Sequence, residues 1–245
     1  MTDAVIYSFT APCAEITLNR GDKLNIFSEE LVEALHSSLN QAELDQARYI
    51  VFRASGRAFS AGLDLSNLAS SSDGDILYRL VRIELLLQRV RHASYGTIAL
   101  VHGNCYGAAA DLVLACRHRI ATSDTRFLMP GIRFGIVLGT RRLRDTVGEN
   151  NASQLLDRSA PFKAKEAYDC GFITAIADQS DWPAQLDSAT SAMLQLSALA
   201  YEQREKSLIP DTRDYDMAAL VRSIASGSIK QQMLEFVDSI KTAKK

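Results

Sequence analysis

The chain has 245 residues, 47% of them hydrophobic, and its 27 basic and 29 acidic side chains give a net charge of −2. This length allows one large domain, or a domain with an appendage, and the apolar content suffices for a core. The near-neutral charge argues against a general nucleic-acid-binding protein. The first ten residues lack the features of a signal peptide, and no apolar run approaches the length of a membrane span. We therefore expect a soluble, cytoplasmic protein with no nucleic-acid or membrane partner.

The four cysteines stand at positions 13, 105, 116 and 170 and form no C-x-x-C pair. Each lies among apolar residues. This pattern predicts buried, reduced thiols rather than a disulfide framework or a zinc site, and we expect no bound metal.

In the first half of the chain, residues 4–9 and 14–18 have strand composition and are separated by a turn at Pro12. Ser28 is a candidate cap for a helix whose leucines recur on one face. A strand over 49–54 follows, and then a polar, serine-rich loop over 66–74. Asp75 is expected to begin a strong amphipathic helix, because apolar residues recur from there at helical spacing.

In the second half, a short apolar strand over 98–101 leads through the turn 102–107 into an Ala/Leu-rich helix, and residues 118–122 are strand-like. Strands alternating with helices indicate an α/β architecture. From about residue 184 the strand signal fades, and three helices are expected, over 186–200, 217–225 and 229–240. We divide the chain into a core, 1–183, and a C-terminal helical region, 184–245.

The turn 102–107 has the pattern of a ligand-binding element. A strand that stops at glycines and restarts as a helix at Ala108 leaves unpaired backbone N–H groups at the positive end of the helix dipole. Such a helix start can hold an anion, or an oxygen that becomes one. Asp111 lies one turn further on the same face. The alternative is that Gly107 only marks a helix boundary and Asp111 only stabilises the dipole, by ~0.3–1 kcal/mol.

A second turn, Gly56 to Leu65, follows the strand 49–54 and is also rich in small residues. Two turns of this kind could each direct one backbone N–H at a common point.

At these residues the chain resembles the enoyl-CoA hydratase/isomerase (crotonase) superfamily. Gly56 to Leu65 matches the signature G-x-A-F-S-A-G-x-D-L, and His102 to Cys116 matches the strand, glycine turn and acid that lead to L-x-L-A-C. Weaker matches lie at Asn19–Asn25 and at Pro161–Ile173. The resemblance implies a spiral of ββα repeats followed by a C-terminal helical appendage. It also implies assembly into a homotrimer, or a hexamer made of two trimers.

Chemically, the resemblance implies an acyl-CoA thioester whose enolate oxygen accepts hydrogen bonds from two backbone N–H groups. By position these belong to Leu63 and Ala108, with Asp111 as the catalytic acid or base. Coenzyme A is then expected as part of the substrate, with no separate cofactor. The residues expected to bind it are Lys23, Leu24, Ala61, Asp64 and Leu65. Lys23 could meet a phosphate or simply be solvated.

The chain departs from the hydratase pattern of two glutamates. Asp111 stands at the first position, one methylene shorter, and Gly131 stands where a second acid normally follows a proline. The stretch after it, residues 136–143, lacks several residues of the family's glycine-rich pattern G-x-G-G-T-Q-R-L, and the basic run Arg117-His118-Arg119 replaces the usual C-D-x-R continuation.

Hydration or dehydration of an enoyl-CoA is the first expectation for the reaction. An isomerase, a decarboxylase or hydrolase, and a non-catalytic acyl-CoA-binding protein are the alternatives. Asp111 could shuttle a proton between carbons, or it could position water with help from Tyr78, Glu84 or Arg133. His102 is expected to pack or form hydrogen bonds rather than act as a base.

Overall fold

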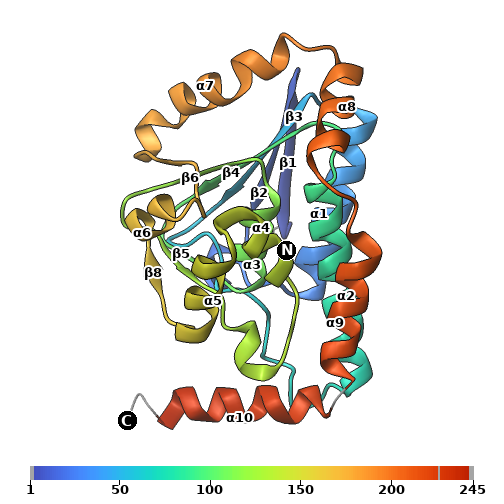
Figure 1. The fold of residues 1–245 in the computed structure, drawn as a ribbon, viewed down its shortest axis with the longest axis vertical. Coiled ribbons are helices and arrows are strands. Elements are labelled where there is room, and N and C mark those ends of the chain that lie inside the picture. The colour runs from blue at the N-terminus through green and yellow to red at the C-terminus, as the bar shows by residue number, and fades with distance from the viewer. Residues whose placement is uncertain (1–2, 226, 243–245) are drawn as a thin grey trace.

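In the computed structural model, which describes residues 3–225 and 227–242, a twisted six-stranded sheet forms the centre of the molecule (Figure 1). Its strand order is β1-β2-β3-β4-β6-β9, and every neighbouring pair is parallel except β1 with β2. A three-stranded sheet, β5-β7-β8, lies beside it. The strands are β1 Val5–Thr10, β2 Cys13–Leu18, β3 Tyr49–Ala54, β4 Gly96–Val101, β5 Asn104–Tyr106, β6 His118–Ala121, β7 Arg126–Leu128, β8 Phe162–Lys163 and β9 Ala175–Ile176.

Helices surround the sheets, and α10 crosses one end of the molecule (Figure 1). The α-helices are α1 Glu29–Leu44, α2 Asp73–Arg91, α3 Ala108–Ala115, α4 Thr140–Val147, α5 Glu149–Arg158, α6 Ala164–Asp169, α7 Trp182–Leu194, α8 Ala198–Leu208, α9 Arg213–Ile224 and α10 Ile229–Thr242. Three short 3-10 helices, η1 Gly21–Lys23, η2 Gly131–Phe134 and η3 Gln179–Asp181, lie in the connections.

The strand-strand-helix repeat follows from how successive strands are shared between the two sheets. β4 joins the large sheet, β5 the small one, and α3 follows directly; β6 and β7 divide in the same way. After β3 the second strand is reduced to isolated parallel bridges, and the bridge between Ser60 and Cys105 joins it to β5. This arrangement confirms the expected spiral of ββα units.

The starts of α1 and α2 show how the sequence sets helix boundaries. Ser28 caps α1 by accepting a hydrogen bond from the Leu31 N–H, as expected. The prediction that α2 begins at Asp75 was wrong by two residues. Ser72 and Asp75 form a reciprocal capping box, so Asp75 is the third residue of the helix rather than its first.

Among the described residues, the C-terminal region contains four helices instead of the three expected. The predicted helix over 186–200 is interrupted after Leu194, because Ser197 caps a new helix, α8, through the Ala200 N–H. Helix α9 packs against α2, and α10 packs against α2 and η2. The division of the chain at residue 183 stays a prediction.

The main hydrophobic core lies between the sheets and helices α1 to α3, and β4 is buried along its whole length. Cys105 and Cys116 are buried as expected, whereas Cys13 and Cys170 are only half-buried; all four are free thiols. Within the described residues, no helix combines the length and the apolar composition needed to cross a membrane.

Candidate active site

The two turns singled out in the sequence lie against each other. The Ser60 N–H donates to Asn104 O at 3.0 Å, and the Tyr106 N–H donates to Ser60 O at 3.0 Å. Gly62 (φ +89°) is packed so tightly that a Cβ there would approach Tyr106 O within 2.6 Å. Only glycine fits this position, because it has no Cβ and adopts positive φ readily.

Leu63 and Ala108 come directly after the two glycines of this contact, Gly62 and Gly107. Ala108 is the first residue of α3, so its N–H has no partner within the helix. The Leu63 N–H is also without an acceptor, since the neighbouring hydrogen bonds to Phe27 use Gly62 O and the Asp64 N–H. In the described part of the chain, the N–H groups of Leu63 and Ala108 are therefore two unpaired donors beside the close contact between the two turns.

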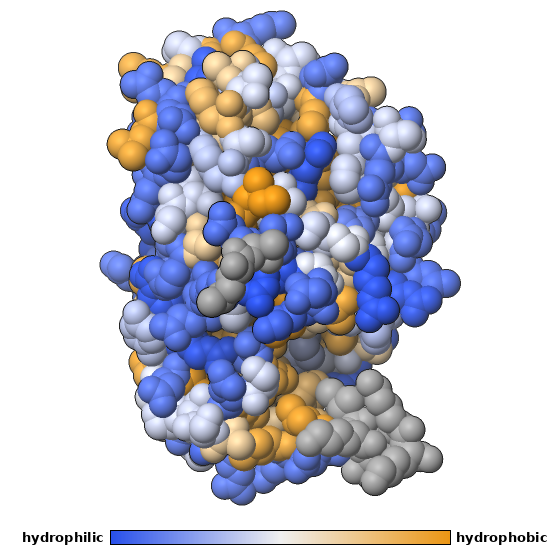
Figure 2. Space-filling model, turned by 180° about the vertical axis from the view of Figure 1, so that it is seen from behind, coloured by the Kyte–Doolittle hydropathy of each residue, from blue (hydrophilic) through white to orange (hydrophobic). Residues whose placement is uncertain are grey.

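Both residues line a cavity of about 540 Å³ whose walls are mostly apolar. The walls come from the two turns, from α2, from the segment 128–140 and from α10, where Phe236 packs edge-on against Phe134 with ring centroids 4.9 Å apart. Seen from behind (Figure 2), hydrophobic surface gathers at the level of α10. The lining residues are Ala61–Leu63, Leu65, Leu80, Tyr106–Ala108, Asp111, Leu128–Ile132, Phe134, Ile136, Leu138–Thr140, Leu156, Pro161 and Phe236.

Asp111 is the one carboxylate among the described residues that line this cavity. It is 5% exposed, and its Oδ1 is buried without a hydrogen-bond partner. Burial raises the pKa of Asp111 to about 7, against an attraction to Arg142 that lowers it. The positive end of the α3 dipole also favours the charged form of Asp111, by ~0.3–1 kcal/mol. The rise of about three units in the Asp111 pKa corresponds to ~4 kcal/mol, so the effect of burial is larger and sets the direction of the pKa shift.

Gly139 makes room for this carboxylate. A Cβ at Gly139 would overlap Asp111 Oδ1, so a side chain there is excluded. Sequence reasoning missed this contact, although the altered glycine-rich segment that contains Gly139 was the visible signal.

A buried ion pair lies one layer behind Asp111. Arg142 on α4 donates from Nη1 to Glu84 Oε1 at 3.0 Å and from Nη2 to Glu84 Oε2 at 2.5 Å. Glu84 is fully buried and Arg142 is 4% exposed. Tyr78, Glu84 and Arg133 were the three residues considered as possible aids to Asp111 in positioning water. Of these, Glu84 lies near Asp111 but is paired with Arg142. Tyr78 is exposed in a different groove, and Arg133 is exposed and donates to Arg158 O at 3.3 Å.

The residues expected to bind coenzyme A divide between two neighbouring surfaces. Ala61 and Leu65 line the apolar cavity, and Leu24 supports them because its carbonyl accepts from the Ala61 N–H at 2.9 Å. Lys23 and Asp64 instead line an adjacent polar groove. The other cations of that groove are engaged, Arg20 with Glu30 at 2.8 Å and Arg79 with Asp64 O at 2.5 Å. Among the described residues Lys23 shows no such partner.

Gly131 borders the cavity, whereas His102 does not. Gly131 lines the cavity, and a Cβ there would meet only ordinary contacts with Ile136, the nearest at 3.6 Å. The position of the absent second acid therefore still borders the site. His102 lies outside the cavity, with Nε2 2.8 Å from Gly56 O and its ring 6.3 Å from that of Trp182, as expected for a packing residue.

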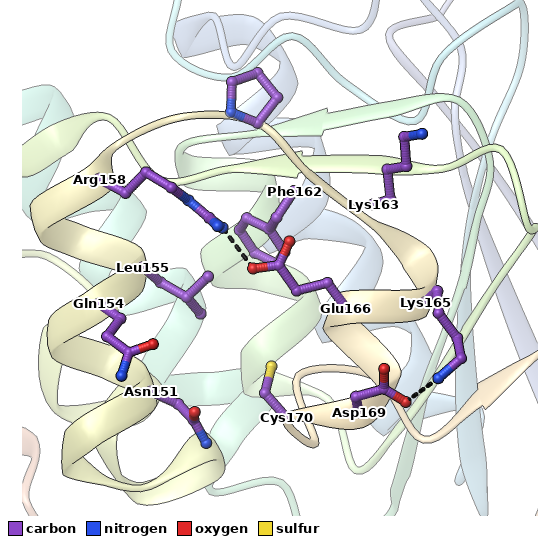
Figure 3. Close-up of a pocket in the computed structure, with 11 residues that line it drawn as sticks. Asn151, Gln154, Leu155, Arg158, Phe162, Lys163, Lys165, Glu166, Asp169 and Cys170 are labelled. Carbon is purple, nitrogen blue, oxygen red and sulfur yellow. Dashed lines mark hydrogen bonds and ion pairs between the residues drawn. The ribbon is translucent and has the colours of Figure 1, made fainter.

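A second cavity, of about 650 Å³, lies between α5 and α6 (Figure 3). Its charged side chains largely neutralise one another: Arg158 pairs with Glu166 at 2.6 Å, and Lys165 pairs with Asp169. It has no buried carboxylate comparable to Asp111, so the apolar cavity is the better candidate for chemistry.

A family model described as enoyl-CoA hydratase/isomerase matches residues 8–240. The chain belongs to the enoyl-CoA hydratase/isomerase family. A solved structure of an enoyl-CoA hydratase/isomerase family protein from Bordetella parapertussis is 40% identical, covers 96% of this chain and 99% of that chain, and superposes with a TM-score of 0.93. The crotonase fold is thereby established.

Relatives within the enoyl-CoA hydratase/isomerase family carry names for different reactions. A Bacillus subtilis (strain 168) protein named probable enoyl-CoA hydratase is 34% identical over 157 residues, which is 61% of this chain and 60% of that protein. The human mitochondrial Delta(3,5)-Delta(2,4)-dienoyl-CoA isomerase is 26% identical over 249 residues, 93% of this chain and 74% of that protein. Membership of the family therefore leaves hydratase and isomerase chemistry both open.

Proposed function

We propose that this protein is an enzyme acting on an acyl-CoA thioester, with Leu63 and Ala108 N–H groups as the oxyanion hole and Asp111 as the acid or base. The observation that carries the proposal is one apolar cavity that contains both unpaired donors and a single buried carboxylate. Each oxyanion-hole donor is typically worth ~2.7–4 kcal/mol of barrier. A carboxylate whose pKa is near 7 can both take and return a proton at neutral pH.

Within this chemistry, transfer of a proton between carbons of an enoyl-CoA is the reaction that the geometry supports best. Such an isomerisation needs one group that removes a proton and replaces it elsewhere. The described cavity lining offers one carboxylate, and Gly131 supplies no second. This reverses the order expected from the sequence, in which hydration came first.

Hydration or dehydration is the second candidate. Two hydroxyl side chains, those of Tyr106 and Thr140, also line the cavity and could hold a water beside Asp111. The name of the Bacillus subtilis relative is consistent with it.

The remaining site assignments belong to the same proposal. Lys23, Leu24, Ala61, Asp64 and Leu65 are proposed to contact coenzyme A, and the chain is proposed to form a trimer or a hexamer. Light scattering at micromolar concentration tests the assembly, and a mass equal to one chain would contradict it.

The reaction is tested with a panel of acyl-CoA thioesters followed by mass spectrometry and chromatography. An isomer without a mass change indicates isomerase activity, a gain of water indicates hydratase activity, and a loss of CO2 indicates decarboxylase activity. Asp111→Asn should slow isomerisation or hydration by ~10²–10⁴, the typical cost of losing general acid–base catalysis. Conversion by Asp111→Asn at the parent rate would contradict the proposal.

A further inference from the structure

Helix α3, which carries Asp111, lies between two helices that carry a buried charge pair. It packs against α2, the helix of Glu84, and against α4, the helix of Arg142. Gly139 touches the Asp111 carboxylate, and Arg142 follows it three residues later, on the same side of the helix start. A guanidinium and a catalytic carboxylate are thus neighbours inside the protein.

These two neighbours do not bond to each other. Both terminal nitrogens of Arg142 are taken by Glu84, and Nη2 also donates to Leu138 O at 3.0 Å. Arg142 Nε and Asp111 Oδ1 are each buried without a hydrogen-bond partner. A buried guanidinium beside an unpaired carboxylate would ordinarily form a bidentate pair, because such pairs are among the strongest hydrogen-bonded contacts in proteins. Glu84 occupies the positions that this pair would need.

We propose that Glu84 is a positioning residue that holds Arg142 away from Asp111, and so keeps the Asp111 carboxylate free to exchange a proton with the substrate. The inference rests on the proposed role of Asp111. Without Glu84, Arg142 would pair with Asp111 and hold it as an inert carboxylate. Without Arg142, Glu84 would be a second unpaired buried acid. Together they place an almost neutral unit behind the catalytic group.

The other charged or titratable groups around this unit fit the same arrangement. Gln88 supports Glu84 by donating to Oε1 at 2.8 Å. On α9, Asp216 lies 3.9 Å from Arg142 but is bound more closely by Arg141, at 2.7 Å. On β5, the Cys105 thiol is fully buried near Asp111, and burial keeps its pKa well above the usual range, so it stays neutral. The attraction of Arg142 lowers the pKa of Asp111 and the repulsion of Glu84 raises it.

The test is the Asp111 pKa in the ligand-free protein, measured by NMR with ¹³C-labelled aspartate and assigned by difference against Asp111→Asn. Glu84→Gln keeps the shape and the bond from Gln88 but removes the negative charge. The pKa of Asp111 should fall, by on the order of one pH unit, because Arg142 is then uncompensated. The acidic limb of the pH–rate profile should move down with it.

The matched control is Glu33→Gln. Glu33 forms the same two-pronged pair with Arg82, with both contacts at 2.6 Å, but lies outside the cavity. This variant should leave the Asp111 pKa unchanged. The double variant Glu84→Gln with Arg142→Gln removes both charges of the pair and leaves neither unpaired at these two positions, so it can fold even if the single variant does not. Its Asp111 pKa should lie above that of the parent, since the lowering influence of Arg142 is the larger of the two.

An unchanged Asp111 pKa in folded Glu84→Gln would overturn the inference, as would a fall in the double variant. Neither result depends on turnover, so each is separate from a failure of the proposed function, which the activity of Asp111→Asn decides.

Discussion

Replacement of Asp111 by asparagine should make the protein more stable, and increasingly so as pH rises. The pKa of this carboxyl is about 7 in the folded protein, against an ordinary value of 3.8, because burial disfavours the charged form. The folded state therefore binds the proton more tightly than the unfolded state between these two values. Stability of the parent falls as pH rises from about 4 to about 7, and the full cost, ~4 kcal/mol, is present above that range. Asparagine has the same shape and carries no such cost.

The measurement is urea unfolding of the parent and of Asp111→Asn at pH 5 and pH 8, at one protein concentration. From these two pKa values, the difference in free energy of unfolding between the proteins should grow by about 2–3 kcal/mol across this range. Asp157→Asn, on the exposed side of α5, controls for the loss of one negative charge. A parent-to-variant difference that stays constant between pH 5 and pH 8 would refute the reasoning about burial.

Ala108→Pro removes the proposed oxyanion N–H donor, and proline is compatible with the first position of α3, so kcat should fall by ~10²–10³ while the protein still folds. Ala108→Ser keeps the N–H and should keep most of the rate. Equal rates for the two variants in the product assay would remove Ala108 from the mechanism. Gly139→Ala drives a methyl group into the Asp111 carboxylate. Calorimetry should show a loss of ~1–3 kcal/mol in stability, and turnover assays should show a loss of most of the activity. A fully active, equally stable variant would show that the carboxylate lies elsewhere. A Cβ at position 131 has room, so Gly131→Glu should create or raise hydratase activity towards a short enoyl-CoA. Mass spectrometry would detect this activity as a gain of water by the substrate. A folded variant without hydratase activity would mean that position 131 does not reach the reacting carbons.

Much of the fold could be predicted from the sequence because local patterns decide it. The β4 strand, the glycine turn and the start of α3 follow from an apolar run, two glycines and an alanine-rich stretch. The break between α7 and α8 was missed because leucine, alanine and methionine continue the helical spacing through it, and only the Ser197 cap marks the new start. The capping box of α2 was readable from Ser72 and Asp75, three residues apart.

For the candidate site, the sequence predicted Asp111, Leu63 and Ala108, and it showed that Gly131 stands where a second acid is usual. It could not indicate that Arg142 and Glu84, 58 residues apart, meet behind Asp111, since such pairing depends on how α2, α3 and α4 pack. Nor could it indicate that Phe236 from the last helix forms part of the cavity wall. Contacts between distant elements carry no local signature.

Asp111 is proposed to move a proton at the carbon next to a thioester carbonyl. The most direct measurement is deuterium exchange from D2O into acyl-CoA thioesters, followed by mass spectrometry, for the parent and for Asp111→Asn. Exchange reports enolate formation whether the net reaction is isomerisation or hydration. We predict deuterium incorporation at the α-carbon by the parent and at least a ~100-fold slower rate for Asp111→Asn. Exchange at the parent rate in Asp111→Asn would contradict the proposed role of Asp111.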